Sequence, residues 1–187
     1  MSNQLDAQLF HEKQSLGYCA IHSLNNLFQE KWLTYDKFYS ISTSLHRADI
    51  ESGNAGWYSW NPYSIPIVGY FDIACIIKAL EMRHFKVSSH IMNADGVSAI
   101  CESAEELYAV KGILVNEECS TFGIFSTRHW YAIVYHQESG AFYNLDSKLD
   151  RPRRLPGTEE LKQLLTESVK NSRSHIFVIS ADENSSS

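Results

Sequence analysis

The chain has 187 residues, which is enough for one well-packed domain but not for two. Its content of 44% hydrophobic and 20% charged residues is typical of a soluble globular protein. The formal net charge of -6, with no long run of either sign, argues against nucleic acid and anionic membranes as main partners.

The N-terminal segment MSNQLDAQLF lacks both a basic region and an apolar core, so we expect no signal peptide. No apolar stretch reaches the length that a membrane span requires. The 4 cysteines include no C-x-x-C pair, which argues against a four-thiolate zinc site. We therefore expect a monomeric, cytoplasmic or nuclear protein with reduced thiols and without a metal or another cofactor.

Two helices are predicted near the start of the chain. Residues 18–30 carry apolar side chains at helical spacing, and a second such stripe follows Thr34, a residue type that often caps a helix N-terminus. The stripes consist of Ala20, Leu24, Leu27 and Phe28, and of Phe38, Ile41 and Leu45. The segment ESGNAGWYSWNPYSIPIVG, residues 51–69, has no periodicity and predicts a long surface loop.

The middle of the chain predicts two further helices. The segment YFDIACIIKALEM is apolar almost all round, which indicates a buried helix. Its expected core positions are Ile73, Ile76, Ile77 and Leu80. Ser103 followed by Glu106 is a candidate capping box for a short helix that ends near Val110. We expect Cys75 and Cys101 in the core.

After Gly112 the pattern predicts strands. The segments ILVN, HWYAIVY and AFYNLDS are rich in strand-forming residues, and a turn at Ser139-Gly140 makes the last two a hairpin. A helix in TEELKQLLTESVK and a strand in HIFVIS follow. The acidic pair Glu117-Glu118 is expected in a solvated loop. Helices early and strands late predict an α+β fold.

Cys19 is the first candidate catalytic residue. It falls at the predicted start of a helix, where unpaired N–H groups and the helix dipole favour a thiolate and can stabilise an oxyanion. The side-chain amide of Gln14, five residues upstream, is a candidate second donor to that oxyanion. A small buried hydrophobic role for Cys19 is the structural alternative.

His129 and Asp146 are the second and third candidates. His129 opens the predicted strand HWYAIVY, and Asp146 ends its hairpin partner, so the two side chains should lie close together. A carboxylate beside an imidazole fixes its tautomer and stabilises the imidazolium. A nucleophile, a base and an orienting carboxylate in this order form a papain-like arrangement.

Four segments carry a resemblance to a known family. The motifs FHEKQ, CAIHSLNNL, HWYAI and FYNLDSKL, in this order over roughly residues 9–180, resemble the signatures of the Josephin family of papain-like cysteine deubiquitinases. GYFDIACIIKAL resembles the central buried helix of that family. The resemblance is nearest to the short, single-domain Josephins.

The resemblance implies a fold and a set of roles. The fold is papain-like α+β, with N-terminal helices packed on a mainly antiparallel sheet in one domain of residues 1–180 and a flexible tail of residues 181–187. Cys19 resembles the nucleophile, His129 the general base and Gln14 the oxyanion-hole donor. Asp146 stands where the family has Asn or Asp as the third catalytic residue. The implied partner is ubiquitin or polyubiquitin, and no cofactor is required.

The segment 46–68 does not align with the family, some members of which have a helical arm beside the cleft here. Within it, Trp57, Tyr58 and Trp60 are candidates for contact with ubiquitin, as a binding surface or a lid. An aromatic loop packed on its own body is the alternative. Trp130 is a candidate wall of a narrow cleft for the C-terminal tail of ubiquitin.

Three other readings stay open. Cys19 and His22 form C-x-x-H, but a zinc site needs two more ligands and no second close pair is present. The chain could be a ubiquitin-binding module with weak or silent catalysis. It could also be a papain-like acyltransferase, because hydrolysis and transfer differ only in the second nucleophile.

Overall fold

The computed structural model describes residues 9–14, 17–56, 58–65, 70–121, 125–171 and 173–183. The helices found there are α2 (Cys19–Phe28), α3 (Tyr35–Glu51), α4 (Ile73–Glu81), α5 (Ala94–Glu102), α6 (Ala104–Ala109) and α7 (Thr158–Asn171). The strands are β1 (Ser64–Ile65), β2 (Tyr70–Phe71), β3 (Phe85–Ile91), β4 (Gly112–Thr121), β5 (Phe125–His136), β6 (Ala141–Asn144), β7 (Arg153–Leu155) and β8 (His175–Ala181).

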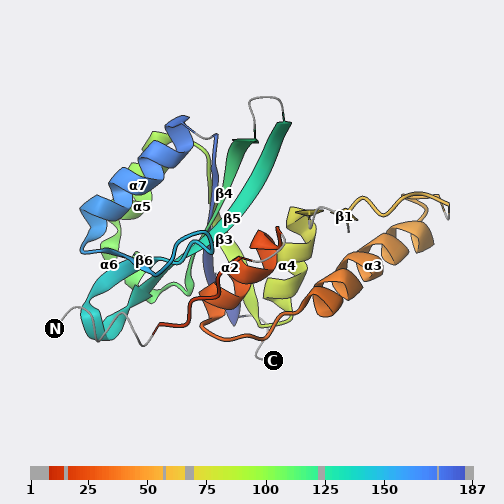
Figure 1. Ribbon diagram of the computed structural model, residues 1–187, viewed down its shortest axis with the longest axis horizontal. Helices are drawn as coiled ribbons and strands as arrows, with labels where there is room; N and C mark the ends of the chain where they lie inside the picture. Colours follow the sequence, from red (N-terminus) through yellow and green to blue (C-terminus); the bar gives the residue numbers. More distant parts are fainter. Residues whose placement is uncertain are drawn as a thin grey trace.

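A six-stranded sheet with the order β3-β8-β4-β5-β6-β7 forms the centre of the molecule (Figure 1). Every neighbouring pair in it is antiparallel. The helices α2 and α4 lie on one side of this sheet, and α5 and α7 lie on the other (Figure 1). The predicted α+β fold, with N-terminal helices packed on an antiparallel sheet, is confirmed.

Strand β5 contributes to the core on both faces of the sheet. Successive side chains of a strand point to opposite faces. Trp130, Ala132 and Val134 therefore pack with α2 and α4 in one hydrophobic cluster. Tyr131 and Ile133 pack with α5 and α7 in a second cluster. This alternation places His129 on the same face as Tyr131.

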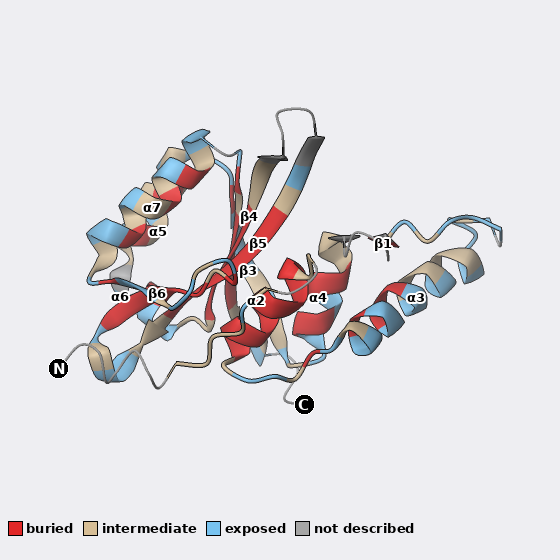
Figure 2. Ribbon diagram, viewed as in Figure 1, coloured by how far each residue is buried: buried red, intermediate tan, exposed pale blue. Residues whose placement is uncertain are grey.

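Helix α2 is buried along its whole length (Figure 2). All ten of its residues are buried, and Leu24 and Leu27 have no exposed surface. Gln29 ends the helix in the left-handed conformation at φ 60°, and its N–H bonds to the last-turn carbonyls of Asn25 and Asn26. Because α2 has no solvent-exposed face, packing against its neighbours fixes its position and with it the position of Cys19.

Helix α3 begins as predicted, with Thr34 as its N-cap accepting a hydrogen bond from the N–H of Lys37. It extends away from the body of the molecule (Figure 1), and its buried residues include Phe38 and Ile41. Helix α4 is buried at Cys75, as expected. The expected burial of Ile77 is wrong, because this side chain is 40% exposed and faces an open cavity.

The structure differs from the local predictions in three places. Strand β3 and helix α5 were not expected; the alternation of β3 is broken by a register shift between Val87 and Ser89, which hides the two-residue period. Ser103 is the N-cap of α6 but its side chain makes no capping hydrogen bond, so there is no capping box. The predicted loop at 51–69 contains β1, which pairs with β2 in a separate two-stranded sheet.

The late strands differ from expectation at Glu117 and Glu118 and agree with it at the hairpin. Glu117 and Glu118 lie in β4 and pair with His129 and Arg128 of β5, so the solvated loop predicted for them is wrong. The hairpin of β5 and β6 is confirmed, with Gly140 at φ 59° in its turn. Strand β8 continues to Ala181, and the N–H of Asp182 bonds to His84, inside the predicted tail. Within the described chain, no helix has the length and apolar character of a membrane span.

Leu24→Ala removes a fully buried side chain from α2. The free energy of unfolding should therefore fall by about 2–5 kcal/mol, as measured by urea denaturation. The exposed Ile77 is a matched control, and Ile77→Ala should cost less than about 1 kcal/mol. Equal losses from the two variants would contradict the burial of α2.

Candidate active site

Cys19 is the first residue of α2 and is 7% exposed. The preceding segment turns sharply, with Gly17 in the left-handed region at φ 76°. The side chain of the N-cap residue Tyr18 makes no capping hydrogen bond. The positive end of the helix dipole therefore acts at the thiol without a competing side-chain cap. The thiol also contacts the backbone carbonyl of Arg128, 4.0 Å away on β5.

His129 lies inside β5 rather than at its start, because the strand begins at Phe125. Its Nε2 is 2.7 Å from Oδ1 of Asp146, and its side chain also hydrogen-bonds Cys19. The imidazole is 4% exposed. The structure thus brings the three predicted side chains together, with the imidazole bonded to both the thiol and the carboxylate.

Asp146 follows β6 and is held by its neighbours in the chain. Its Oδ1 accepts a hydrogen bond from the N–H of Lys148 at 2.9 Å. Its own N–H donates to Oδ1 of Asn144 at 2.9 Å, and His11 Nε2 lies 2.9 Å from its carbonyl oxygen. Contacts other than that with His129 therefore hold both the carboxylate and the backbone of Asp146 in place.

Burial and hydrogen bonding act in opposite directions on His129. Burial lowers the pKa of the imidazole, but the hydrogen bonds to Asp146 and Cys19, and the charges of those groups, outweigh it and raise the pKa to about 9. For Asp146, burial raises the pKa, and the hydrogen bond and charge of His129 reverse this and lower it overall. At neutral pH the pair is an imidazolium next to a carboxylate.

Gln14 lies in a segment that runs beside the residues after β6. Its N–H donates to the carbonyl of Ser147 at 2.8 Å, and the Ser147 hydroxyl donates to Oε1 of Gln14 at 3.4 Å. With its oxygen held by Ser147, the Gln14 amide presents its NH2 group away from that contact. The two residues that follow Gln14 lie outside the described part of the chain.

Asn26 joins this segment to α2 and to the strand end. Its Oδ1 accepts the N–H of Glu12 at 2.6 Å, and its Nδ2 donates to the carbonyl of Leu145 at 2.8 Å. The Glu12 carboxylate in turn accepts from Asn25 at 2.7 Å and lies 3.2 Å from Nδ1 of His22. His22 thus faces a carboxylate inside the fold. In the described residues no cluster of three or more His, Cys, Asp or Glu side chains could hold a metal ion.

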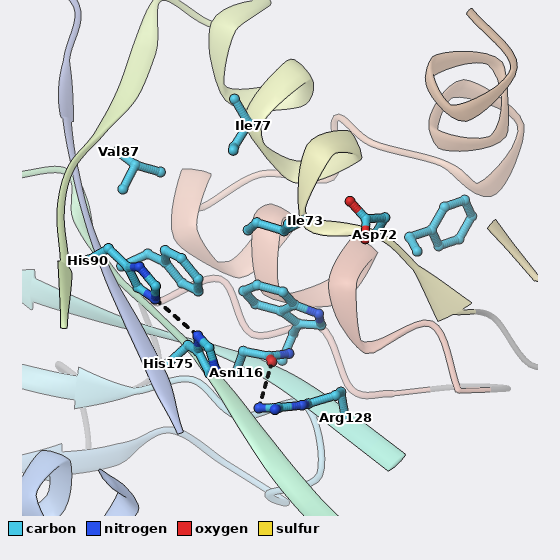
Figure 3. Close-up of a pocket in the computed structure, with 11 residues that line it drawn as sticks. Asp72, Ile73, Ile77, Val87, His90, Asn116, Arg128 and His175 are labelled. Atoms are coloured by element: carbon cyan, nitrogen blue, oxygen red, sulfur yellow. Dashed lines mark hydrogen bonds between the residues drawn. The ribbon is translucent and has the colours of Figure 1, made fainter. Parts of the chain in front are cut away.

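A cavity of about 560 Å³ opens between α4 and the sheet. Figure 3 shows Ile73 and Ile77 of α4 on one side and Arg128, Asn116 and the histidines of β3 and β8 on the other. Arg128 donates to Oδ1 of Asn116 at 3.3 Å. Arg128 therefore lines the cavity and also contacts the Cys19 thiol through its backbone carbonyl.

The predicted substrate-binding aromatics separate into two places. Trp130 is 6% exposed and lines the cavity, where it stacks on Phe177 with the ring centroids 5.6 Å apart. Tyr58 and Trp60 are 80% and 95% exposed and line a different hollow of about 400 Å³ along α3. Trp57 lies outside the described residues.

A family model described as Josephin matches residues 14–180. The chain belongs to the Josephin family. The matched residues include every candidate catalytic residue, and a Josephin domain has the papain-like fold that the resemblance implied.

The Josephin relatives compared here are 25–29% identical to this chain. A Josephin-like protein of Arabidopsis thaliana is 29% identical over 172 residues, which cover 88% of this chain and 45% of that protein. A Josephin-like protein of Drosophila melanogaster is 28% identical over 159 residues, 81% of this chain and 64% of that protein. Josephin-2 of Mus musculus is 26% identical over 187 residues, 94% and 87% of the two chains. The chain therefore spans about half to two thirds of the length of the first two.

The remaining cysteines of this Josephin chain differ from Cys19 in their surroundings. Burial raises the pKa of Cys75 to about 12, and burial also raises the pKa of Cys101 and of Cys119. Raised pKa values keep these thiols protonated and unreactive at neutral pH. Of the four, Cys19 alone has a hydrogen bond to an imidazole among the contacts described here.

Several residues near the site were not predicted. His11 and Lys148 fix Asp146, and Ser147 orients Gln14. These contacts join positions more than 100 residues apart or lie within a turn, so no local spacing pattern could reveal them. Glu117 was placed in a loop, but its carboxylate accepts hydrogen bonds from Tyr131 and Ser168 behind His129.

The raised pKa of His129 predicts a pH-dependent stability. Its folded-state pKa of about 9 lies above the unfolded value of 6.5, so the contribution is complete below pH 6.5 and is lost as the pH rises through about 9. Its upper limit is about 3 kcal/mol. The difference in free energy of unfolding between wild type and His129→Gln should be larger at about pH 6 than at about pH 9.5. A constant difference would contradict the raised pKa.

Proposed function

We propose that this chain is a cysteine-type deubiquitinase, which hydrolyses peptide or isopeptide bonds at the C-terminal glycine of ubiquitin. The supporting observation is the continuous line from Cys19 through His129 to Asp146, with a 2.7 Å hydrogen bond at its far end, in a chain of the Josephin family. A structural cysteine needs neither an imidazole partner nor a helix N-terminus.

The first half-reaction forms a thioester. The Cys19 thiolate, with protonated His129 as its partner, attacks the carbonyl carbon of the terminal glycine, and the carbonyl oxygen becomes an oxyanion. Collapse of this intermediate breaks the carbon–nitrogen bond, and His129 gives its proton to the leaving lysine amine. Asp146 keeps the imidazole oriented and stabilises its charge throughout.

The second half-reaction releases ubiquitin. Neutral His129 takes a proton from water, the resulting hydroxide attacks the thioester carbon, and collapse expels the Cys19 thiolate. In both steps the backbone N–H groups at the start of α2 and the Gln14 side chain stabilise the oxyanion. The hydrogen bond from Ser147 to Oε1 of Gln14 leaves the NH2 group for this task.

The cavity beside the thiol is the proposed site for the C-terminal tail of ubiquitin. It shares the Arg128 segment with Cys19 and has an apolar lining from α4 and Trp130, interrupted by a few polar side chains. A cavity of this size and lining could accept the extended C-terminal tail of ubiquitin. The exposed side chains of Tyr58 and Trp60 on the α3 hollow are a second proposed contact with ubiquitin.

The function is tested with ubiquitin that carries an electrophile at its C-terminus. Wild type should form a covalent adduct visible by mass spectrometry, and Cys19→Ala should form none, because the thiol is the attacking group. Cys119→Ser is the matched control and should still form the adduct. Noncovalent ubiquitin binding without an adduct would favour the binding module, and capture of the thioester by an added amine in preference to water would favour the acyltransferase.

Trp130→Phe tests the cavity. It keeps an aromatic ring against Phe177 but shortens the wall of the cavity, so KM for a ubiquitin conjugate should rise about threefold to tenfold with little change in kcat. Steady-state kinetics on ubiquitin with a C-terminal fluorophore measure both constants. Tyr58→Ala is the comparison on the other hollow. Unchanged KM in the Trp130 variant would remove the cavity from the binding site.

A further inference from the structure

A hydrogen-bonded cluster lies on the same face of the β4–β5 strand pair as the candidate general base. The hydroxyl of Tyr131 donates to Oε1 of Glu117 at 2.9 Å, and the hydroxyl of Ser168 on α7 donates to the same oxygen at 2.9 Å. The two hydroxyl oxygens are 3.1 Å apart. Tyr131 and Ser168 are 2% and 5% exposed, so this carboxylate has two buried donors on one of its oxygens.

The cluster is built onto the strand pair that carries His129. Glu117 of β4 is the direct cross-strand partner of His129 of β5, and directly paired residues have Cβ atoms about 4.5–5.5 Å apart on the same face of the sheet. Tyr131 is two residues further along β5 on that face, with its ring centroid 6.2 Å from that of His129. Ser168 adds a tie to helix α7.

We propose that Glu117 is a positioning residue for His129: its carboxylate, held by Tyr131 and Ser168, fixes the back of the imidazole and stabilises the protonated ring. This inference rests on the catalytic role proposed for His129. The Glu117 carboxylate does not touch the substrate or the reacting atoms, so it acts only through the imidazole. The site then has two carboxylates, Asp146 in contact with the ring and Glu117 across the strand pair.

No other side chain described around His129, apart from Asp146, supplies a carboxylate charge like that of Glu117. The elements packed around His129 carry six titratable or charged side chains. Asp146 and Cys19 act on the imidazole directly, Glu117 and Tyr131 share its face of the strand pair, and Cys119 and Lys148 contact each other close by. Burial, and after it the charge of Glu117, raises the pKa of Tyr131, so this hydroxyl stays protonated and remains a donor. Cys119 lies 4.0 Å from Lys148, and burial raises its pKa. Among the described residues around His129, the carboxylates are therefore those of Glu117 and Asp146.

The test compares Glu117→Gln with Glu118→Gln. Both remove one negative charge from adjacent positions of β4, but Glu118 pairs with Arg128 and lies on the opposite face. The titration of the His129 imidazole is followed by NMR, with its signal assigned by its loss in His129→Gln. Glu117→Gln should lower the midpoint by about 1 pH unit, and Glu118→Gln should leave it within about 0.2 pH unit of wild type.

Ser168→Ala separates the hydrogen bonds from the charge and serves where Glu117→Gln does not fold. It removes one donor and leaves the carboxylate, so the midpoint should stay while the reaction of Cys19 with electrophilic ubiquitin slows roughly tenfold. Equal midpoints in the two glutamine variants, or an unchanged rate in Ser168→Ala, would overturn the inference. A shifted midpoint in a protein that never reacts with ubiquitin would refute the proposed function alone, since the NMR titration needs no catalysis.

Discussion

The side chain of Asn26 is the interaction on which the candidate site depends. It is fully buried on α2, and its amide bonds to both backbone groups of Glu12 and to the carbonyl of Leu145. Asn26 lies on the helix that carries Cys19, Glu12 lies on the segment that carries Gln14, and Leu145 directly precedes Asp146. A buried amide left without partners costs about 1–3 kcal/mol. The three segments are therefore stable together in this arrangement and unfavourable apart.

The electrostatics of the site follow from this assembly. Burial alone would make His129 a neutral imidazole, because a low-dielectric interior disfavours its charge. Asp146 and Cys19 reverse that preference only where the docked segments bring them within hydrogen-bonding distance. The protonation state that the chemistry needs is thus a property of the folded site. The same logic explains why the outer partners of Asp146, His11 and Lys148, matter: they hold the carboxylate that charges the imidazole.

The parts of this structure that were predictable are those with a local signal. The helix start at Cys19 and the hairpin that joins His129 to Asp146 can be read from residue spacing, and the order of the motifs indicates the family. The β-bulge in β3 hides its two-residue period, and the face on which Glu117 lies depends on the register in which β4 pairs with β5. The environment of Trp60 depends on how α3 leaves the body, which no spacing encodes. Side chains whose roles come from docking between distant segments, such as Ser147 on Gln14, were likewise out of reach.

The pH dependence of kcat/KM for hydrolysis of ubiquitin with a C-terminal aminocoumarin tests the central claim most directly. A thiolate–imidazolium pair held by Asp146 predicts a plateau near neutral pH and a fall as the pH rises through about 9, where His129 loses its proton. A rate that continues to rise above that pH would mean that the nucleophile is a thiol that ionises on its own, without a protonated His129. That result, or no hydrolysis at any pH, would contradict the account.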